Sequence, residues 1–309
     1  MNERIIAVDI GATNLRVAEC SLVEIIRKLQ EKTDRDNGPM GVSQQIIRMI
    51  KSLDIKPISI GIGSIGPLDL KKGSIVNTPN FVFKNIPVVE PLLDEFHIPV
   101  KMLNDCATGV LGEWKYGAGK TYENVVYITL STGLGGGAIV DGHLLIGKDG
   151  NAVEIGHITI DPDSSLICGC GCRGHWEAYC GGSHMSQLSE YVLGKDIKQF
   201  KKRFGVITAE KVFNLAKTGD ANSSKIVEEY GRVNTIGFAD VVNVYDPEVL
   251  TVGGSIALNN PELVITPILE HIDNHLINRK PKIMTTSLGE DVTLYGALAL
   301  AIRIRSKIS

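Results

Sequence analysis

The chain predicts an α/β fold, and three observations support this prediction. Short apolar runs typical of strands alternate with segments whose apolar residues recur at helical spacing. A strand-like start occurs twice, near residue 5 and near residue 125, and each leads into a glycine-rich turn. No short-period repeat or low-complexity segment occurs in the sequence. The pattern favours two related domains that face each other.

In the first half, a strand is expected over residues 4–9, where an apolar run ends in the carboxylate of Asp9. A glycine turn over 11–14 follows, and residues 15–20 alternate like a second strand. The further elements expected in this half are a helix over 43–53, a strand over 58–62, a helix over 88–96 and a strand over 99–103.

In the second half, a strand over 124–130 leads into a glycine turn over 131–137. A hairpin over 138–145 should follow, because Asp141-Gly142 is a strong two-residue turn signal. The remaining expected elements are a mostly helical stretch over 190–245, a strand over 249–252, a helix over 261–276 and a closing helix over 294–304.

Composition and charge exclude several classes of protein. The 309 residues suit two domains of ordinary size, with 43% hydrophobic and 22% charged residues. The net charge of -3 gives no electrostatic reason to expect nucleic acid or an anionic membrane as a partner. No apolar run reaches the roughly 18 residues of a membrane span, and the N-terminus enters a strand without a signal peptide. We therefore expect a cytoplasmic protein.

Glycine turns follow three of the expected strands. At the first turn Asp9 can hold a hydrated magnesium ion, although an ordinary hairpin turn capped by Asp9 and Thr13 explains that stretch alone equally well. The second, over 131–137, formally matches a dinucleotide fingerprint, but a hairpin and not a helix is expected to follow, so a Rossmann site is rejected. Gly253-Gly254 forms the third turn, and small residues at such turns let phosphate groups approach the backbone.

Asn104-Asp105 ends another expected strand. A carboxylate at this place can accept a proton from a substrate hydroxyl, as phosphoryl transfer requires. Asn and Asp are also preferred helix N-caps, and for an isolated Asn-Asp pair the cap is the better interpretation.

Four cysteines lie within thirteen positions, from Cys168 to Cys180, and this clustering favours metal in a reducing compartment. Cys168 and Cys170 are closely spaced, and His157 precedes Cys168 by eleven residues. His175 and Cys172 compete for the fourth ligand position of a tetrahedral zinc ion. Buried free cysteines with a surface histidine are the alternative. A closed zinc shell would be structural and not catalytic.

Taken together, these stretches resemble the ROK family of sugar kinases and repressors, within the actin/hexokinase/Hsp70 ATPase superfamily. The resemblance runs nearly end to end and depends on several motifs in the expected order. They are Asp9-Ile-Gly-Ala-Thr13, Gly66-Pro-Leu-Asp69, Pro79-Asn80, Leu103-Asn-Asp-Cys-Ala107, Ser131-Thr-Gly-Leu-Gly-Gly-Gly137, Gly150-Asn-Ala-Val-Glu-Ile-Gly-His157 and Pro247-Glu-Val-Leu-Thr-Val-Gly-Gly254.

The resemblance implies two ribonuclease H-like (actin-like ATPase) domains around a cleft. The N-terminal domain would span 1–106, completed by a C-terminal helix at about 290–309, and the larger domain would span 107–289 with the zinc motif. The implied reaction is ATP-dependent phosphorylation of a hexose at the 6-hydroxyl. Glucose is the first choice on family frequency, with N-acetylmannosamine and other N-acetylhexosamines as alternatives. Magnesium, structural zinc and a homo-oligomer (dimer or tetramer) are also implied.

The resemblance assigns roles residue by residue. Asp105 would be the base for the sugar hydroxyl, and the implied sugar-binding residues are Asn80, Asn104, Asp105, Glu154, His157 and Glu177. The implied nucleotide-binding residues are Asp9, Gly11, Thr13, Asn14, Thr132, Gly133, Gly135, Gly253 and Gly254. The implied metal ligands are His157, Cys168, Cys170 and His175, with Cys172 as the alternative fourth ligand. His157 would place one ring nitrogen on zinc and the other toward the sugar.

The chain departs from the family pattern at one place. The family motif reads Cys-x-Cys-Gly-x-x-Gly-Cys-x-Glu, and here His175 stands where its third cysteine is expected, while Cys172 is an additional cysteine. Repressors of the family carry a winged-helix segment before the first phosphate motif. That motif begins at residue 9 here, so a repressor is not expected. A chaperone or filament ATPase of the superfamily would not need Glu154, His157 and the cysteine motif.

Overall fold

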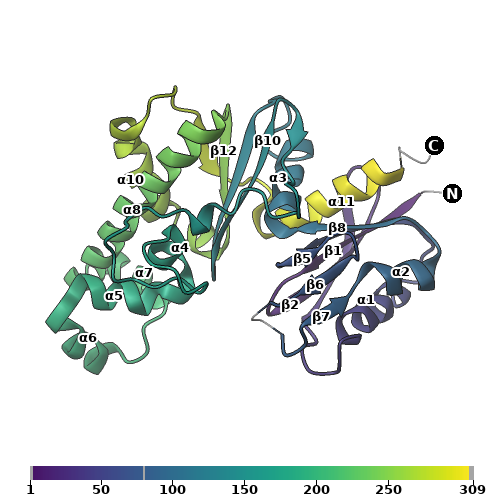
Figure 1. The fold of residues 1–309 in the computed structure, drawn as a ribbon, viewed down its shortest axis with the longest axis horizontal. Helices are drawn as coiled ribbons and strands as arrows, with labels where there is room; N and C mark the ends of the chain where they lie inside the picture. Colours follow the sequence, from purple (N-terminus) through teal and green to yellow (C-terminus); the bar gives the residue numbers. More distant parts are fainter. Residues whose placement is uncertain (1–2, 79–80, 306–309) are drawn as a thin grey trace. The chain divides into compact units, whose positions relative to one another are not determined.

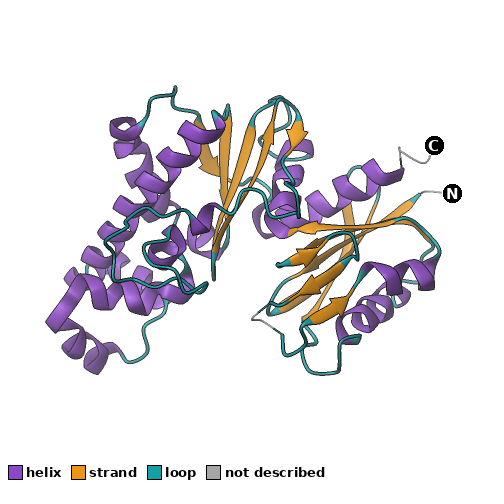
Figure 2. Cartoon of the chain, viewed as in Figure 1, coloured by secondary structure: helices purple, strands orange, loops and turns teal. Residues whose placement is uncertain are grey.

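The structure is a computed structural model that describes residues 3–78 and 81–305. Two compact units make up the chain. Unit 1 comprises Met1–Glu123, Gly137–Val153 and Asp291–Ser309, and unit 2 comprises Asn124–Gly136 and Glu154–Glu290. Strands and helices alternate in both units (Figures 1 and 2), so the predicted α/β class is confirmed. The domain boundaries expected from the sequence stay a prediction.

Unit 1 is built on a five-stranded sheet with the order β3-β2-β1-β4-β8. Strands β1, β2 and β3 form an antiparallel meander, whereas β4 and β8 continue the sheet parallel to β1. The bounds are β1 Arg4–Ile10, β2 Asn14–Cys20, β3 Ile25–Lys32, β4 Pro57–Ser64 and β8 Val100–Asn104.

Strand β1 is buried on both faces, and this explains its continuous apolar run. Alternate side chains of a strand point to opposite faces of the sheet. Ile6, Val8 and Ile10 belong to a core cluster shared with α1, while Ile5 and Ala7 belong to a second cluster shared with α11. The helices of unit 1 are α1 Gly41–Lys51, α2 Val89–Phe96, α3 Asp105–Lys115 and α11 Val292–Arg305, and a small sheet comprises β5 Leu68–Asp69, β6 Ser74–Val76 and β7 Asn85–Pro87.

Unit 2 contains the core of a second sheet, ordered β11-β10-β9-β12-β13. Strands β12 and β13 run parallel to β9, and β11 pairs antiparallel with β10. The order therefore repeats that of the first sheet, with an outer hairpin followed by parallel strands. The bounds are β9 Val125–Leu130, β10 Leu134–Val140, β11 His143–Leu144, β12 Val249–Gly253 and β13 Lys282–Thr285, and the chain passes into unit 1 within β10. The repeat confirms the two related α/β domains expected from the sequence.

The helices of unit 2 lie mainly between β10 and β13 in the sequence. They are α4 Trp176–Cys180, α5 Met185–Leu193, α6 Ile197–Phe204, α7 Ala209–Lys217, α8 Ala221–Tyr245, α9 Ser255–Asn259 and α10 Pro261–His271, with 3₁₀ turns η1 Ile155–His157, η2 Gly182–His184, η3 Gly194–Asp196, η4 Ile272–His275 and η5 Gly289–Asp291. Helix α4 is anchored by Trp176, which is fully buried and donates its indole N–H to Asn234 of α8 at 3.0 Å. None of the helices in the described ranges is long and apolar enough to cross a membrane.

Several elements differ from the sequence expectation. Strand β3, the small sheet and β13 were not predicted, because their short or strongly charged segments carry little period-2 signal. The second glycine turn is shorter than predicted, since residues 134–137 already belong to β10 and only 131–133 form the turn. The hairpin turn at Asp141-Gly142 is confirmed, with φ of 50° and 71°.

Candidate functional site

The first glycine turn joins β1 to β2 in unit 1. The amide of Gly11 donates to the carbonyl of Asn14 at 3.0 Å and closes the turn. Thr33, which follows β3, donates its amide to Thr13 O at 2.9 Å and its hydroxyl to Gly11 O at 2.8 Å. The side chains of Thr13 and Asn14 are exposed. The turn is therefore fixed by its neighbouring loop, while its outer residues remain accessible to a ligand.

Asp9 precedes this turn and lies directly opposite Arg16 of β2. Arg16 donates to Oδ2 of Asp9 through Nε at 2.9 Å and through Nη2, and its Nη1 lies 3.3 Å from Oδ1 of Asp291. Burial raises the pKa of the Asp9 carboxyl, while the Arg16 guanidinium acts in the opposite direction. Sequence reasoning missed Arg16, although counting back from the turn pairs it with Asp9 across the hairpin.

Asn104 and Asp105 lie where β8 passes into α3. Asn104 is the N-cap, and its Oδ1 accepts the amide of Cys106 at 2.9 Å. Asp105 is the first helical residue, and its Oδ1 accepts the same amide at 2.8 Å. The N-cap interpretation is thus confirmed for Asn104. The cap and a role in catalysis are compatible, because Asp105 is only half-buried.

The first glycine turn and Asp105 lie at the same edge of the sheet. In the parallel register Ile10 is opposite Ser64 of β4, and Ser64 is opposite Asn104. The ends of β1 and β8 are therefore two strand spacings apart, about 9–10 Å. This edge of unit 1 brings together Asp9, Gly11, Thr13, Asn14, Asn104 and Asp105. Asn80, expected to contact the sugar, lies outside the described residues.

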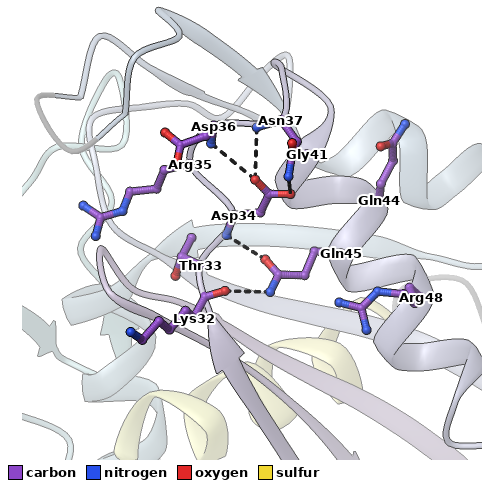
Figure 3. Close-up of a pocket in the computed structure, with 10 residues that line it drawn as sticks. All are labelled: Lys32, Thr33, Asp34, Arg35, Asp36, Asn37, Gly41, Gln44, Gln45 and Arg48. Carbon is purple, nitrogen blue, oxygen red and sulfur yellow. Dashed lines mark hydrogen bonds between the residues drawn. The ribbon is translucent and has the colours of Figure 1, made fainter.

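A cavity of about 620 Å³ lies beside β3 and α1 in unit 1 (Figure 3). None of the predicted site residues lines it. Its polar groups are largely committed to one another: Gln45 accepts the Asp34 amide at 2.9 Å and donates to Lys32 O at 2.8 Å, and Asp34 accepts the Asn37 amide at 3.1 Å. We infer that the side chains around this cavity hold the loop that carries Thr33 in place. We do not interpret the cavity as the substrate site.

The second glycine turn joins β9 to β10 in unit 2. Thr132 is exposed and Gly133 is half-buried, and the strand after the turn confirms that no helix of a Rossmann site begins here. Gly253 of β12 is paired with Thr129 of β9, so the third glycine turn lies at the same sheet edge. Gly254 has φ of 85°, and a Cβ there would lie 2.3 Å from Leu130 O, so only glycine fits. Gly135 lies within β10 and not in the turn.

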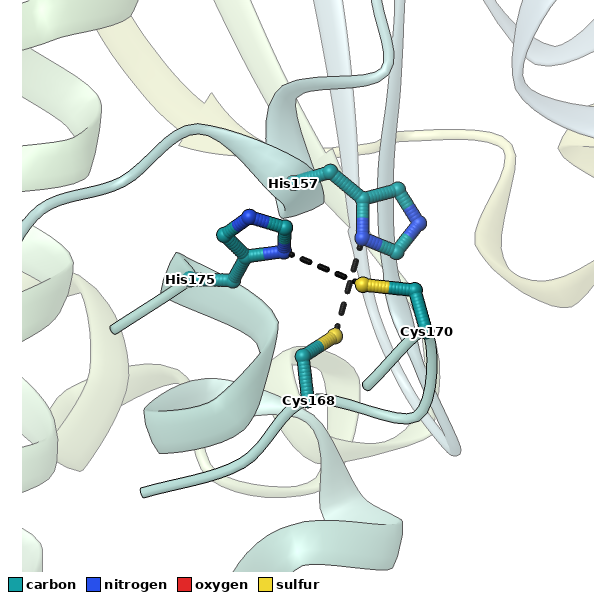
Figure 4. A group of neighbouring side chains, drawn as sticks. All are labelled: His157, Cys168, Cys170 and His175. Atoms are coloured by element: carbon teal, nitrogen blue, oxygen red, sulfur yellow. Dashed lines mark hydrogen bonds between the residues drawn. The ribbon is translucent and has the colours of Figure 1, made fainter. Parts of the chain in front are cut away.

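Four side chains form a cluster suited to a metal ion in unit 2 (Figure 4). One ligand atom from each of His157, Cys168, Cys170 and His175 lies within 4.8 Å of the others. Sγ of Cys168 is 3.6 Å from Nδ1 of His157, and Sγ of Cys170 is 3.3 Å from Nδ1 of His175. Sulfur and nitrogen ligands of one tetrahedral zinc ion lie about 3.6 Å apart, given Zn–S of about 2.3 Å and Zn–N of about 2.1 Å. These residues therefore fit zinc.

The electrostatics of the metal-free cluster favour the metal-binding form of His175 but not that of Cys168. Burial lowers the pKa of His175, and His157 lowers it further, so the neutral imidazole that binds metal is favoured. Burial raises the pKa of Cys168 to about 12, so a cation is required to make it a thiolate. Cys172 is exposed and is not part of the four-residue cluster. Of the two alternatives left open by the sequence, the geometry favours His175.

The carboxylates expected to contact the sugar surround this cluster. Nδ1 of His157 faces Cys168, while its Nε2 lies 4.0 Å from Oε2 of Glu154, so the two ring nitrogens face different partners. Burial raises the pKa of Glu154, the His157 charge lowers it, and the Glu177 charge raises it again. Glu177 accepts the Leu134 amide on Oε2 at 2.9 Å.

The sequence as a whole matches the model of the ROK family over residues 5–304. The chain belongs to the ROK family. A glucokinase from Pyrobaculum calidifontis is 38% identical over 300 residues, covering 96% of this chain and 95% of that protein. The family membership confirms the resemblance drawn from the motifs.

Solved structures of the family share the fold. The crystal structure of a ROK hexokinase from Thermus thermophilus superposes with a TM-score of 0.84 at 28% identity, covering 99% of this chain and 100% of that chain. A ROK family glucokinase from Streptomyces griseus, crystallised with glucose and AMPPNP, gives a TM-score of 0.80 at 28% identity, covering 97% of this chain and 99% of that chain. The actin-like ATPase fold expected from the sequence is thereby confirmed.

Proposed function

We propose that this ROK protein is an ATP-dependent hexose kinase that phosphorylates the 6-hydroxyl, with glucose as its first substrate. The observation that carries the proposal is the near end-to-end match to a glucokinase, at 38% identity over 96% of the chain. The glycine turns at the edges of both sheets, where backbone amides can meet phosphate groups, support the same conclusion.

Asp105 is the proposed general base. Its place at the start of α3 fixes the carboxylate to a rigid element at the edge that carries the first glycine turn. A carboxylate so placed can accept the proton of the attacking hydroxyl while the phosphoryl group is transferred. Asn104 caps the same helix through Oδ1, which leaves its amide nitrogen to donate to a sugar oxygen.

The nucleotide is assigned to the glycine turns. The proposed nucleotide-binding residues are Asp9, Gly11, Thr13, Asn14, Thr132, Gly133, Gly135, Gly253 and Gly254. Asp9 offers Oδ1 for the hydration shell of magnesium, since Arg16 occupies Oδ2. Magnesium would neutralise charge on the phosphates; the protein's part is to position them.

The sugar is assigned to Glu154, His157 and Glu177, with Asn80 and Asn104. Zinc held by His157, Cys168, Cys170 and His175 would have a closed shell, so its contribution would be to fix shape and not to activate water. An ion bound to Nδ1 of His157 would fix the tautomer of the ring and leave Nε2 to face away from the cluster. A homo-oligomer, dimer or tetramer, is part of the proposal.

A coupled assay of ADP release over a panel of sugars tests the proposal. We expect ADP release only when a hexose is added, with the highest kcat/KM for glucose among glucose, mannose, N-acetylmannosamine and N-acetylglucosamine. A higher kcat/KM for an N-acetylhexosamine would change the assigned substrate from glucose to that sugar. ATP turnover that is indifferent to sugar would contradict the kinase assignment itself.

A further inference from the structure

The second glycine turn is held by a segment that follows the metal cluster in the sequence. The amide of Gly182 donates to Ser131 O at 2.8 Å, and the amide of Ser183 donates to Thr132 O at 2.9 Å. Both donors lie just after α4, a helix whose N-cap is His175. The chain therefore runs directly from a candidate metal ligand, through five helical residues, to the carbonyls of the turn.

Glu177, the second residue of α4, makes the most direct connection. Its Oε2 accepts the amide of Leu134, the first residue of β10 directly after the turn, at 2.9 Å. Its Oε1 lies 3.4 Å from Sγ of Cys168 in the cluster. Each oxygen of one carboxylate thus faces a different structure, the turn on one side and the metal cluster on the other. A hydrogen bond to a charged group is among the stronger ones in proteins.

The fit between Glu177 and the turn is close. A Cβ built on Gly133 would lie 2.7 Å from Oε2 of Glu177, and no other residue beyond its neighbours would come within 4 Å of it. The φ of Gly133 is not in the left-handed region that disfavours side chains. Within the described structure, an alanine at 133 would therefore meet only the carboxylate of Glu177, which would have to shift away from the turn to make room for it.

We propose that Glu177 is a positioning residue for the nucleotide, which fixes the turn at 131–133 and couples it to the metal cluster. This inference deepens the proposed function and rests on it, because the turn is assigned there to the nucleotide. It adds a second task to a side chain expected to serve the sugar only. Disturbing the metal cluster should consequently weaken nucleotide binding as well as sugar binding.

A double-mutant cycle tests the coupling. The variants are Gly133→Ala, Glu177→Ala and the double variant, and the measurement is the Kd of Mg-ADP by calorimetry without sugar. Each single variant should weaken binding about tenfold, the scale of one charged hydrogen bond. The double variant should also be weakened about tenfold and not a hundredfold, because the alanine at 133 clashes only with the side chain that Glu177→Ala removes.

Two further variants separate positioning from general damage. Glu177→Gln keeps an oxygen that can accept the Leu134 amide, so its Kd for Mg-ADP should stay within threefold of the parent while its sugar KM rises. Glu154→Ala is the matched control, since Glu154 contacts His157 and makes no hydrogen bond to the turn among the described residues. It should raise the sugar KM and leave the Kd for Mg-ADP unchanged.

Two results would overturn the inference. One is additive losses in the cycle, which would mean that the nucleotide itself needs the space at Gly133. The other is an unchanged Kd for Mg-ADP in a folded Glu177→Ala protein. Failure of this inference can be distinguished from failure of the proposed function. If the variants change Mg-ADP binding in this pattern but the protein phosphorylates no sugar, the coupling stands and only the kinase assignment is wrong.

Discussion

The turn after β1 and the turn after β9 occupy the same position in two sheets of the same strand order, yet they are held by different parts of the chain. The first is held by Thr33, two strands further along the chain, and follows a carboxylate paired with Arg16. The second is held by residues 177–183, more than forty positions later, in the segment that leaves the metal cluster. The two equivalent turns thus differ in their support: the first is held by residues of its own meander, and the second by residues that lie far away in the sequence.

The difference indicates that the stability of each turn depends on a different part of the molecule. A turn held by its own meander depends on the packing of unit 1, and its stability should follow that of the sheet. A turn held through Glu177 depends on the loop beside it, and the four candidate metal ligands determine the geometry of that loop. The predictions below separate these two dependences.

The largest effect is expected at a residue that belongs to neither turn. Asp105→Asn should lower turnover about 10²–10⁴-fold, the usual contribution of a positioned base. The Kd values for Mg-ADP and for the sugar should change little, since Asn keeps the shape of the side chain. Steady-state kinetics together with calorimetry measure both. Turnover within threefold of the parent would remove Asp105 from the role of base.

A change at the metal cluster should reach the second turn and not the first. His175→Ala should weaken metal binding by more than about 100-fold, since even outer-shell changes cost 10–100-fold. It should also raise both the sugar KM and the Kd for Mg-ADP. Metal analysis of purified protein measures the first effect, and Cys172→Ala is the matched control that should retain the metal. Metal loss in the Cys172 variant, with retention in the His175 variant, would reverse the ligand assignment.

A change beside the first turn should act on stability. Arg16→Gln leaves the buried carboxylate of Asp9 without its cation, which typically costs about 3 kcal/mol or more. Burial already raises the pKa of Asp9, and loss of Arg16 should raise it further. A carboxyl with a raised pKa favours the folded state at low pH and loses that benefit as pH rises through the folded pKa. The difference in Tm between variant and parent should therefore shrink as pH falls toward 4, and a constant difference would contradict this explanation.

The smallest effect should come from the bond between Thr33 and Gly11. Thr33→Val removes a hydroxyl that donates at 2.8 Å and keeps the shape of the side chain, so we expect a loss of at most about 1 kcal/mol in nucleotide binding. Thr33→Ser is the control and should bind as the parent does. Equal affinities for the Val and Ser variants would show that the amide of Thr33 alone is sufficient.

The sequence predicted the features whose cause is local. Runs of buried residues indicated β1, β4, β8, β9 and β12, and Asp141-Gly142 fixed the hairpin. The pairing of Asp9 with Arg16 also follows from the hairpin register and was overlooked. The contact of Glu177 with Leu134 could not have been predicted, because it depends on where α4 packs, and this is set by the burial of Trp176 against α8.

Hydrogen exchange at two backbone amides tests most directly whether the second turn depends on Glu177. The amide of Leu134 donates to Glu177, and the amide of Gly11 donates to Asn14, so the two report on the two turns within one experiment. In folded Glu177→Ala protein, we predict exchange about tenfold faster at Leu134, from loss of one charged hydrogen bond, and unchanged exchange at Gly11. Unchanged protection at Leu134, or equal acceleration at both amides, would contradict the account.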